Sequence, residues 1–167
     1  MAPFRLRALP RDAKVFLTAF LVVLTLGYAS GLSYVYLTTR MIPRGIASHY
    51  AGSESETEMN FPKSPLELIQ TTHNHILSLS VVFALVGGLL FGAEISARLR
   101  LALVVESFAA ILTSFGSLWL VRYVSPLFAW VLLASGIAMA ASFFIAVALV
   151  ITDMWRRGGT NSSSFVR

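Results

Sequence analysis

The sequence contains no cysteine among its 167 residues. This absence excludes disulfide bonds, thiolate metal sites, iron–sulfur clusters held by the chain and covalently attached c-type haem. It also means that cysteine usage gives no information about the compartment in which the protein resides. Any cofactor would have to be held by other residue types.

Charged residues are scarce as well. They make up 13% of the chain, compared with about a quarter of an average soluble protein. Hydrophobic residues make up 56%, and the mean hydropathy is +0.74. This composition predicts an integral membrane protein. The pI of about 10.1 does not indicate a nucleic-acid partner, because the basic residues flank apolar segments and form no stripe interleaved with aromatic residues.

What the chain has instead is four apolar runs, each of about the length that crosses a bilayer. A signal peptide is the alternative for the first run, but that run is longer than a usual signal-peptide core and continues apolar to Leu37. The predicted fold is an all-α integral membrane protein with four transmembrane helices in an up-down-up-down bundle. Its predicted segments are a basic cytoplasmic arm (1–14), a transmembrane domain (15–157) with spans at about 15–37, 65–93, 101–121 and 126–152, an outer loop (38–64) and a flexible cytoplasmic tail (158–167).

The distribution of Lys and Arg predicts the orientation of the spans. Nine of these residues lie on the side of the two termini, and four lie on the side of the long loop. Because cytoplasmic segments are enriched in Lys and Arg, both termini should be cytoplasmic and the loop should face outwards. The predicted location is a bacterial inner membrane, as a multi-pass protein. Tyr28, Tyr34 and Tyr36 lie towards the end of the first span and suit the membrane–water interface on its outward-facing side.

A helix-start signature marks the second span. Ser64 is placed as the N-cap, Pro65 suits the first helical position, and Glu67 completes a Ser-x-x-Glu capping box. Polar residues fill roughly the next three turns before the apolar stretch begins. We expect a membrane helix whose outer end is exposed to water. In the loop before this helix, residues 52–58 are polar enough to be mobile. The more apolar residues 41–46 and 59–62 suit a position on the membrane surface.

Polar side chains gather at the predicted outer ends of the second and third spans, which a short turn makes neighbours. We interpret this cluster as a surface that docks other membrane-protein subunits and anchors to lipid headgroups. Arg122 should reach Glu67 or a lipid phosphate. His73 and His75 should point in opposite directions, one into the bundle and one towards the loop or a partner. The predicted interaction residues are Glu67, Gln70, His73, His75, Arg122 and Tyr123.

The two helix histidines are also strong candidate ligands. Because they are two positions apart on a helix, they point roughly 200° away from each other and cannot chelate one ion, so we expect no metal site. A b-type haem is an alternative, because four-helix membrane bundles can hold haem between axial histidines. It would use His73 or His75, and His49, Met139 or a partner subunit would supply the second ligand.

Glu106 is an intramembrane ionisable residue of the third span. At about 1.5 Å of rise per residue it lies roughly 8–9 Å from the helix start, so it should pair with Arg98 or Arg100. The alternative is proton or ion handling, since membrane carboxylates often mark ion paths. In that case the protein would be a small transporter or channel.

Small residues predict close contacts between helices. The segment 134–142 is rich in Ala, Gly and Ser, and two pairs of glycines, Gly27 with Gly31 and Gly88 with Gly92, are spaced four residues apart. These surfaces favour helix association over chemistry. The sequence has no nucleotide-binding loop and no nucleophile with a base, so we predict that the protein is not an enzyme and has no catalytic residue.

Three short segments carry a resemblance to a known group. Residues 43–52, 61–64 and 68–75 resemble a pattern in small four-span bacterial inner-membrane proteins associated with membrane cytochrome systems. The resemblance implies an electron-transfer setting, respiratory or photosynthetic, and transfers no catalytic residue. We therefore predict that the protein is an accessory transmembrane subunit of a larger bacterial membrane complex and contacts the lipid bilayer. We also expect contact with a specific lipid, quinone or pigment.

Overall fold

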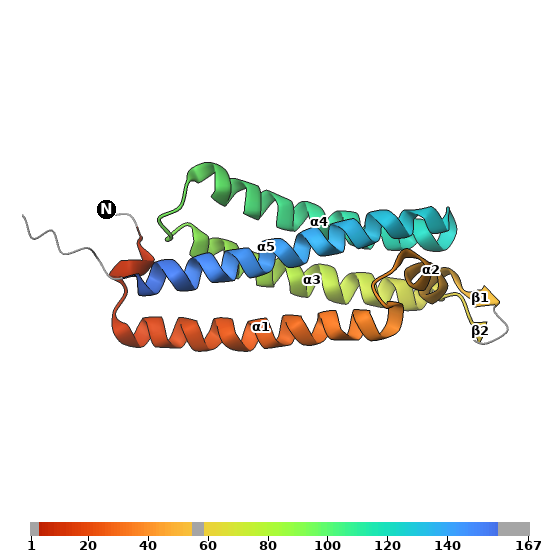
Figure 1. Cartoon of the computed structure of the whole chain (residues 1–167), viewed down its shortest axis with the longest axis horizontal. Coiled ribbons are helices and arrows are strands. Elements are labelled where there is room, and N and C mark those ends of the chain that lie inside the picture. Colours follow the sequence, from red (N-terminus) through yellow and green to blue (C-terminus); the bar gives the residue numbers. More distant parts are fainter. Residues whose placement is uncertain (1–3, 55–58, 157–167) are drawn as a thin grey trace, which may run out of the picture.

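A computed structural model describes residues 4–54 and 59–156 of the chain. Within these residues, four long helices lie side by side and alternate in direction (Figure 1). Each is long and apolar enough to cross a membrane, the last of them together with the short helix η2 (Pro126–Phe128) that precedes it. The predicted all-α fold with four spans is therefore confirmed. The four helices are α1 (Arg11–Thr39), α3 (Pro65–Leu90), α4 (Ala97–Tyr123) and α5 (Ala129–Trp155).

The loop between the first two spans contains regular structure. Helix α2 (Pro43–Ala51) crosses one end of the bundle, and β1 (Ser53–Glu54) pairs antiparallel with β2 (Met59–Asn60) (Figure 1). The predicted mobile segment 52–58 thus begins in a small hairpin, and its residues 55–58 lie outside the described residues. We call this end of the molecule the α2 end and the opposite end the Asp153 end.

The capping box at the start of α3 is present as predicted. The Ser64 hydroxyl accepts a hydrogen bond from the Glu67 amide at 3.3 Å, and the Glu67 carboxylate accepts one from the Ser64 amide at 2.8 Å. Two backbone donors that have no partner inside the helix are thereby satisfied. This local arrangement fixes where the helix starts and keeps its first turn at the bundle end.

The core is built around α4, which packs against α3 and α5. Phe115 and Leu118 of α4 are buried in one cluster with Phe83 of α3 and Phe143 of α5. Helix α1 is held at its ends and middle instead. At the Asp153 end the Trp155 indole donates to Thr18 at 3.0 Å. In the middle of α1 the Tyr28 ring stacks on Phe143 at 4.1 Å, so the prediction that Tyr28 belongs to the interface is wrong.

The glycines do not have the predicted role in close helix packing. A methyl group added at Gly27, Gly31 or Gly88 would meet nothing within 4 Å. At Gly92 it would meet Phe4 and Leu6 of the N-terminal segment, not another long helix. The expected glycine contacts between spans of this chain are therefore wrong, because three of these glycines have open space beside them and the N-terminal segment covers the fourth.

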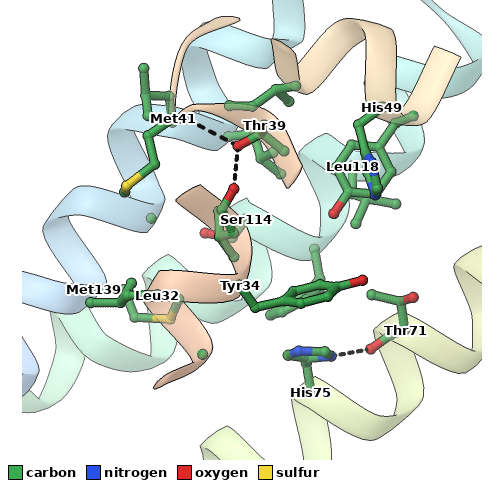
Figure 2. A pocket seen from close by; sticks show the side chains of 18 of the residues that line it. Leu32, Tyr34, Thr39, Met41, His49, Thr71, His75, Ser114, Leu118 and Met139 are labelled. Carbon is green, nitrogen blue, oxygen red and sulfur yellow. Dashed lines mark hydrogen bonds between the residues drawn. The ribbon is translucent and has the colours of Figure 1, made fainter. Parts of the chain in front are cut away.

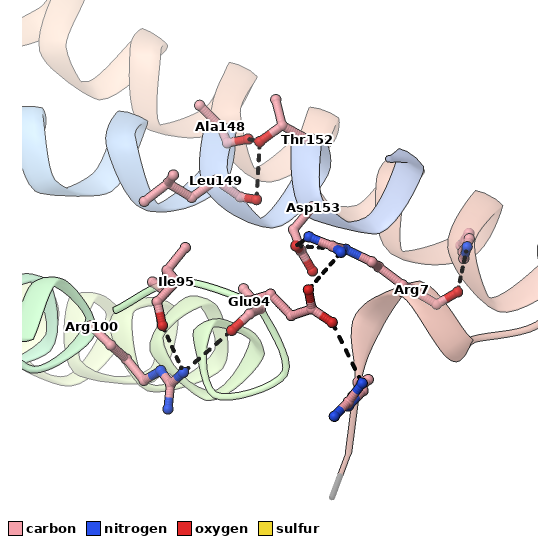
Figure 3. A network of polar contacts seen from close by, with 11 residues as sticks. Arg7, Glu94, Ile95, Arg100, Ala148, Leu149, Thr152 and Asp153 are labelled. Atoms are coloured by element: carbon pink, nitrogen blue, oxygen red, sulfur yellow. Dashed lines mark hydrogen bonds and ion pairs between the residues drawn. The ribbon is translucent and has the colours of Figure 1, made fainter. Parts of the chain in front are cut away.

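The Asp153 end is closed by the N-terminal segment. Leu6, in the short helix η1 (Leu6–Ala8), is fully buried and donates its amide to the Gly92 carbonyl at 2.9 Å. Figure 3 shows the Arg7 side chain between Asp153 and Glu94. Its guanidinium contacts the Asp153 carboxylate at 2.7 Å and the Glu94 carboxylate at 2.6 Å. Residues of the predicted basic arm are thus packed onto the bundle and join the start of the chain to both α5 and the turn after α3.

Candidate functional site

A cavity of about 620 Å³ lies in the half of the bundle nearest the α2 end. Its walls come from α1, α3, α4 and α5, and α2 forms its roof. Glycines Gly27, Gly31 and Gly136 line it, and a methyl group at any of them would meet nothing within 4 Å. The space exists because these helices stand apart where they carry no side chain. The apolar wall residues include Leu68, Leu79, Phe115, Leu118, Leu132 and Ile137.

Polar side chains are gathered at one end of this cavity. His49 and Tyr50 reach it from α2, and Thr71 and His75 reach it from α3. Lys63 and Glu67 also line it, and they form an ion pair at 2.9 Å that neutralises both charges. The cavity therefore combines a polar, nearly neutral end with apolar walls, which is the usual character of a small-molecule site.

A second cavity of about 330 Å³ lies beside the first, between α1 and α3. The two cavities share Gly27, Tyr28 and Leu79 in their linings. Val23, which lines the second cavity, is 69% exposed, so this space reaches the lateral surface of the bundle. We call it the lateral groove. In a membrane this surface faces lipid, and an apolar chain could extend from the cavity into the bilayer along it.

His75 has a fixed arrangement of its two ring nitrogens (Figure 2). Its Nδ1 atom lies 2.8 Å from the carbonyl oxygen of Thr71. A carbonyl can only accept a hydrogen bond, so Nδ1 carries the proton and, in the neutral ring, Nε2 carries the lone pair. The imidazole also lies 5.3 Å from the Phe115 ring, centroid to centroid. The cavity is therefore lined by an imidazole that offers a hydrogen-bond acceptor beside an aromatic surface.

The structure separates the two helix histidines. Both side chains are exposed, but His75 lines the cavity, whereas His73 belongs to neither cavity lining among the described residues. This agrees with the expected opposite directions of side chains two positions apart. Of the other predicted interaction residues, Glu67 and Gln70 line the cavity, while Tyr123 is exposed at the end of α4 and its ring stacks on Trp119 at 5.9 Å.

Arg122 does not contact Glu67, so the predicted direct pair is wrong. Its Nε atom donates to the Lys63 carbonyl at 2.9 Å, and its guanidinium lies 5.0 Å from the Tyr123 ring. Lys63 in turn pairs with Glu67 through its ammonium group. Lys63 thus links the two predicted partners, because the backbone just before α3 passes over the end of α4. The Trp119 indole adds a second tie between these helices by donating to Thr72 at 3.0 Å.

The roof of the cavity favours neutral side chains. Burial lowers the pKa of His49, the nearby Lys63 ammonium lowers it further, and the Glu67 carboxylate partly offsets both effects. Burial also raises the pKa of Tyr50, and Tyr34 adds to this effect. Both residues of α2 therefore keep their uncharged forms near neutral pH.

The fit of a b-type haem is mixed. His75 has the right tautomer for an axial ligand, and His49 and Met139 line the same cavity. His73, the other predicted ligand, lies outside the cavity lining that the described residues form. Tyr34 also lines this cavity, and Figure 2 shows its ring together with the His49 and His75 imidazoles.

Glu106 contacts α5 and not the basic residues at the start of its own helix. The Ser142 hydroxyl donates to its carboxylate, while Arg100 donates to the carbonyls of Ala93 at 3.3 Å and Ile95 at 3.4 Å. The predicted pairing with Arg100 is therefore wrong, because the guanidinium folds back over the turn (Figure 3). Within the described residues Glu106 belongs to neither cavity lining.

Comparison with known proteins finds a family profile that matches the chain. A profile of a transmembrane helical domain, Aq_1264_TM, matches residues 40–161. The chain belongs to this transmembrane helical domain family. In the Aq_1264_TM region lie α2, α3, α4 and α5, and with them His49, His75 and Gly136, whereas the cavity residues of α1 precede it. No curated protein and no solved structure matches the chain.

Proposed function

We propose that this protein is a non-catalytic transmembrane subunit that binds a lipid-soluble molecule in the cavity at the α2 end. The cavity and the lateral groove together carry the proposal. A polar cavity end, with apolar walls and an apolar groove beside it at the lateral surface, fits a molecule with a small head and an apolar tail. A volume of about 620 Å³ also lies within the roughly 300–1,000 Å³ range of small-molecule sites.

The setting of this subunit is a bacterial inner membrane, with the α2 end outside and both termini in the cytoplasm. The excess of Lys and Arg on the side of the termini supports this orientation. The resemblance of 43–52, 61–64 and 68–75 to small proteins of membrane cytochrome systems supports a place in an electron-transfer complex. These segments contribute His49, Lys63 and His75 to the cavity, so the resemblance and the candidate site coincide.

Docking to other subunits would use the exposed polar residues beside the cavity. His73 and Tyr123 are exposed at the α2 end and available to a partner, whereas Arg122 holds the loop before α3. We expect His73→Ala to reduce co-purification of partner subunits under mild detergent while the protein stays in the membrane. Unchanged co-purification would place the partner surface elsewhere.

The binding proposal is tested by filling the cavity. Gly31→Leu and Gly136→Leu should each reduce the amount of lipophilic small molecule that mass spectrometry detects in organic extracts of the purified protein. Gly88→Leu is the matched control, because Gly88 also has open space around it but lies outside both cavity linings of the described chain. Equal amounts of bound molecule in all three variants would contradict the proposal.

The two alternatives give different signals. A b-type haem bound through His75 would give purified protein a Soret absorption band. A transporter would lose flux in proteoliposomes on Glu106→Gln, and the hydrogen bond from Ser142 supports a structural role for that carboxylate. If either signal is observed, the corresponding alternative function replaces the binding proposal.

A further inference from the structure

We infer that the head group recognised in the cavity is a ring hydroxyl that donates a hydrogen bond to Nε2 of His75, so that the ligand belongs to the class of hydroquinones with an apolar tail. This inference rests on the proposed binding function and names its ligand. It follows from three observations, namely the tautomer of His75, the charge balance at the polar end and the position of the lateral groove.

The tautomer decides the direction of the hydrogen bond. The Nδ1–H group of His75 donates its hydrogen bond to the Thr71 carbonyl, and the nitrogen and oxygen atoms are 2.8 Å apart. The neutral ring then has only an acceptor left at Nε2. A ligand hydroxyl can donate to this atom, whereas a quinone carbonyl is itself an acceptor and cannot form a hydrogen bond with it. At Nε2 of His75 the reduced, hydroxylated ring is therefore favoured over the oxidised one.

The charge balance disfavours an anionic head group. Lys63 is the cation of the cavity lining in the described residues, and its ammonium is already paired with Glu67 at 2.9 Å. A phospholipid phosphate would bring a second negative charge next to the Glu67 carboxylate and would compete with it for Lys63. A neutral ring avoids this cost, and it can pack against the Phe115 ring that lies beside His75.

The lateral groove provides a place for the tail. Its lining of Phe20, Val23, Leu24 and Val82 is apolar, and it lies beside the cavity, with which it shares Gly27, Tyr28 and Leu79. A head group bound at His75 would therefore have its tail directed along α1 towards lipid. A ring without a tail would leave this apolar groove unfilled and should bind more weakly.

The experiment uses decylubiquinol, a hydroquinone with a ten-carbon tail, its dimethyl ether and the oxidised quinone as probes. Each is titrated into the full-length protein in detergent, and affinity is obtained from the concentration dependence of Tm and from co-elution in gel filtration. We expect the hydroquinone to bind wild-type protein about tenfold more tightly than the ether, the value of one good hydrogen bond. The oxidised quinone should resemble the ether.

Matched variants locate the effect. His75→Phe keeps an aromatic ring beside Phe115 but removes the acceptor, so the preference for the hydroquinone over the ether should fall to about one. His73→Phe makes the same change at a position outside the cavity lining of the described residues and should keep the preference of the wild type. His75→Gln retains an acceptor oxygen and should keep part of the preference, and it takes the place of the phenylalanine variant if that protein does not fold.

The outcomes separate the two levels of the argument. Equal binding of hydroquinone and ether to wild-type protein, or tighter binding of the oxidised quinone, would overturn the head-group assignment while the cavity stays a binding site. Failure of all three probes to bind, together with no loss of extracted lipophile in Gly31→Leu, would overturn the proposed function as well. A preference that survives in His75→Phe would also overturn the assignment.

Discussion

Arg7 and Asp153 stand 146 positions apart in the sequence, and their side chains form an ion pair at the Asp153 end. The Arg7 Nε and Nη2 atoms donate to the same carboxylate oxygen at 3.0 and 2.7 Å. Asp153 is only 5% exposed, and its second oxygen has no hydrogen-bond partner among the described residues. The stability of this carboxylate in the bundle therefore depends on one arginine from the start of the chain.

Substitution of Arg7 should lower the free energy of unfolding substantially. Arg7→Ala leaves the Asp153 carboxylate buried without its cation, and breaking a buried pair in this way typically costs about 3–5 kcal/mol. Arg5→Ala is the control, because Arg5 is 61% exposed and lies 3.6 Å from Glu94, so its loss should cost less than about 1 kcal/mol. Reversible unfolding in mixed detergent and SDS micelles measures both free energies. Similar values for the two variants would show that Asp153 is solvated in the membrane.

The corner between α1 and α2 requires a glycine. A methyl group on Gly45 would overlap the Thr39 carbonyl, which is backbone and cannot turn aside. Gly45→Ala should therefore move α2 off the end of the bundle and destabilise the protein by about 1–3 kcal/mol in the same unfolding assay. Gly27→Ala, in open space on α1, should be neutral or stabilising because alanine is the better helix former. Equal stability of the two variants would contradict this role for Gly45.

The capping box should contribute a measurable amount of stability. Ser64→Ala removes the acceptor for the Glu67 amide, and such caps are worth about 1 kcal/mol. Ser78→Ala is a suitable control, since its hydroxyl only bonds back to carbonyls of its own helix, mainly that of Asn74 at 2.7 Å. We expect a lower free energy of unfolding for Ser64→Ala alone. An effect of the same size in both variants would argue that the cap adds nothing specific.

Orientation can be tested without removing any native thiol, because the chain has no cysteine. Met59→Cys and Ser96→Cys place single exposed thiols at the α2 end and at the opposite end of the bundle. The asymmetry of Lys and Arg predicts that a membrane-impermeant maleimide labels intact cells at position 59 and not at position 96. The reverse pattern of labelling would place the proposed cavity at the cytoplasmic side.

Local sequence was enough to determine the spans and the start of α3. The length of an apolar run and the Ser-x-x-Glu box depend only on neighbouring residues, so four spans and the cap at Ser64 could be read directly. The opposite directions of His73 and His75 followed from helical geometry in the same way. Their different roles did not, because the sequence does not say which side of α3 faces the bundle.

Only the tertiary structure decided which side chains meet. In a membrane, lipid and protein core are equally apolar, so hydrophobicity does not fix the rotation or offset of one helix against another. For this reason Arg122 could not be assigned to the Lys63 carbonyl, nor Arg7 to Asp153. The cavity needs Gly27, His75 and Gly136 on three helices at one depth, and that meeting is a property of packing that no single segment of the sequence contains.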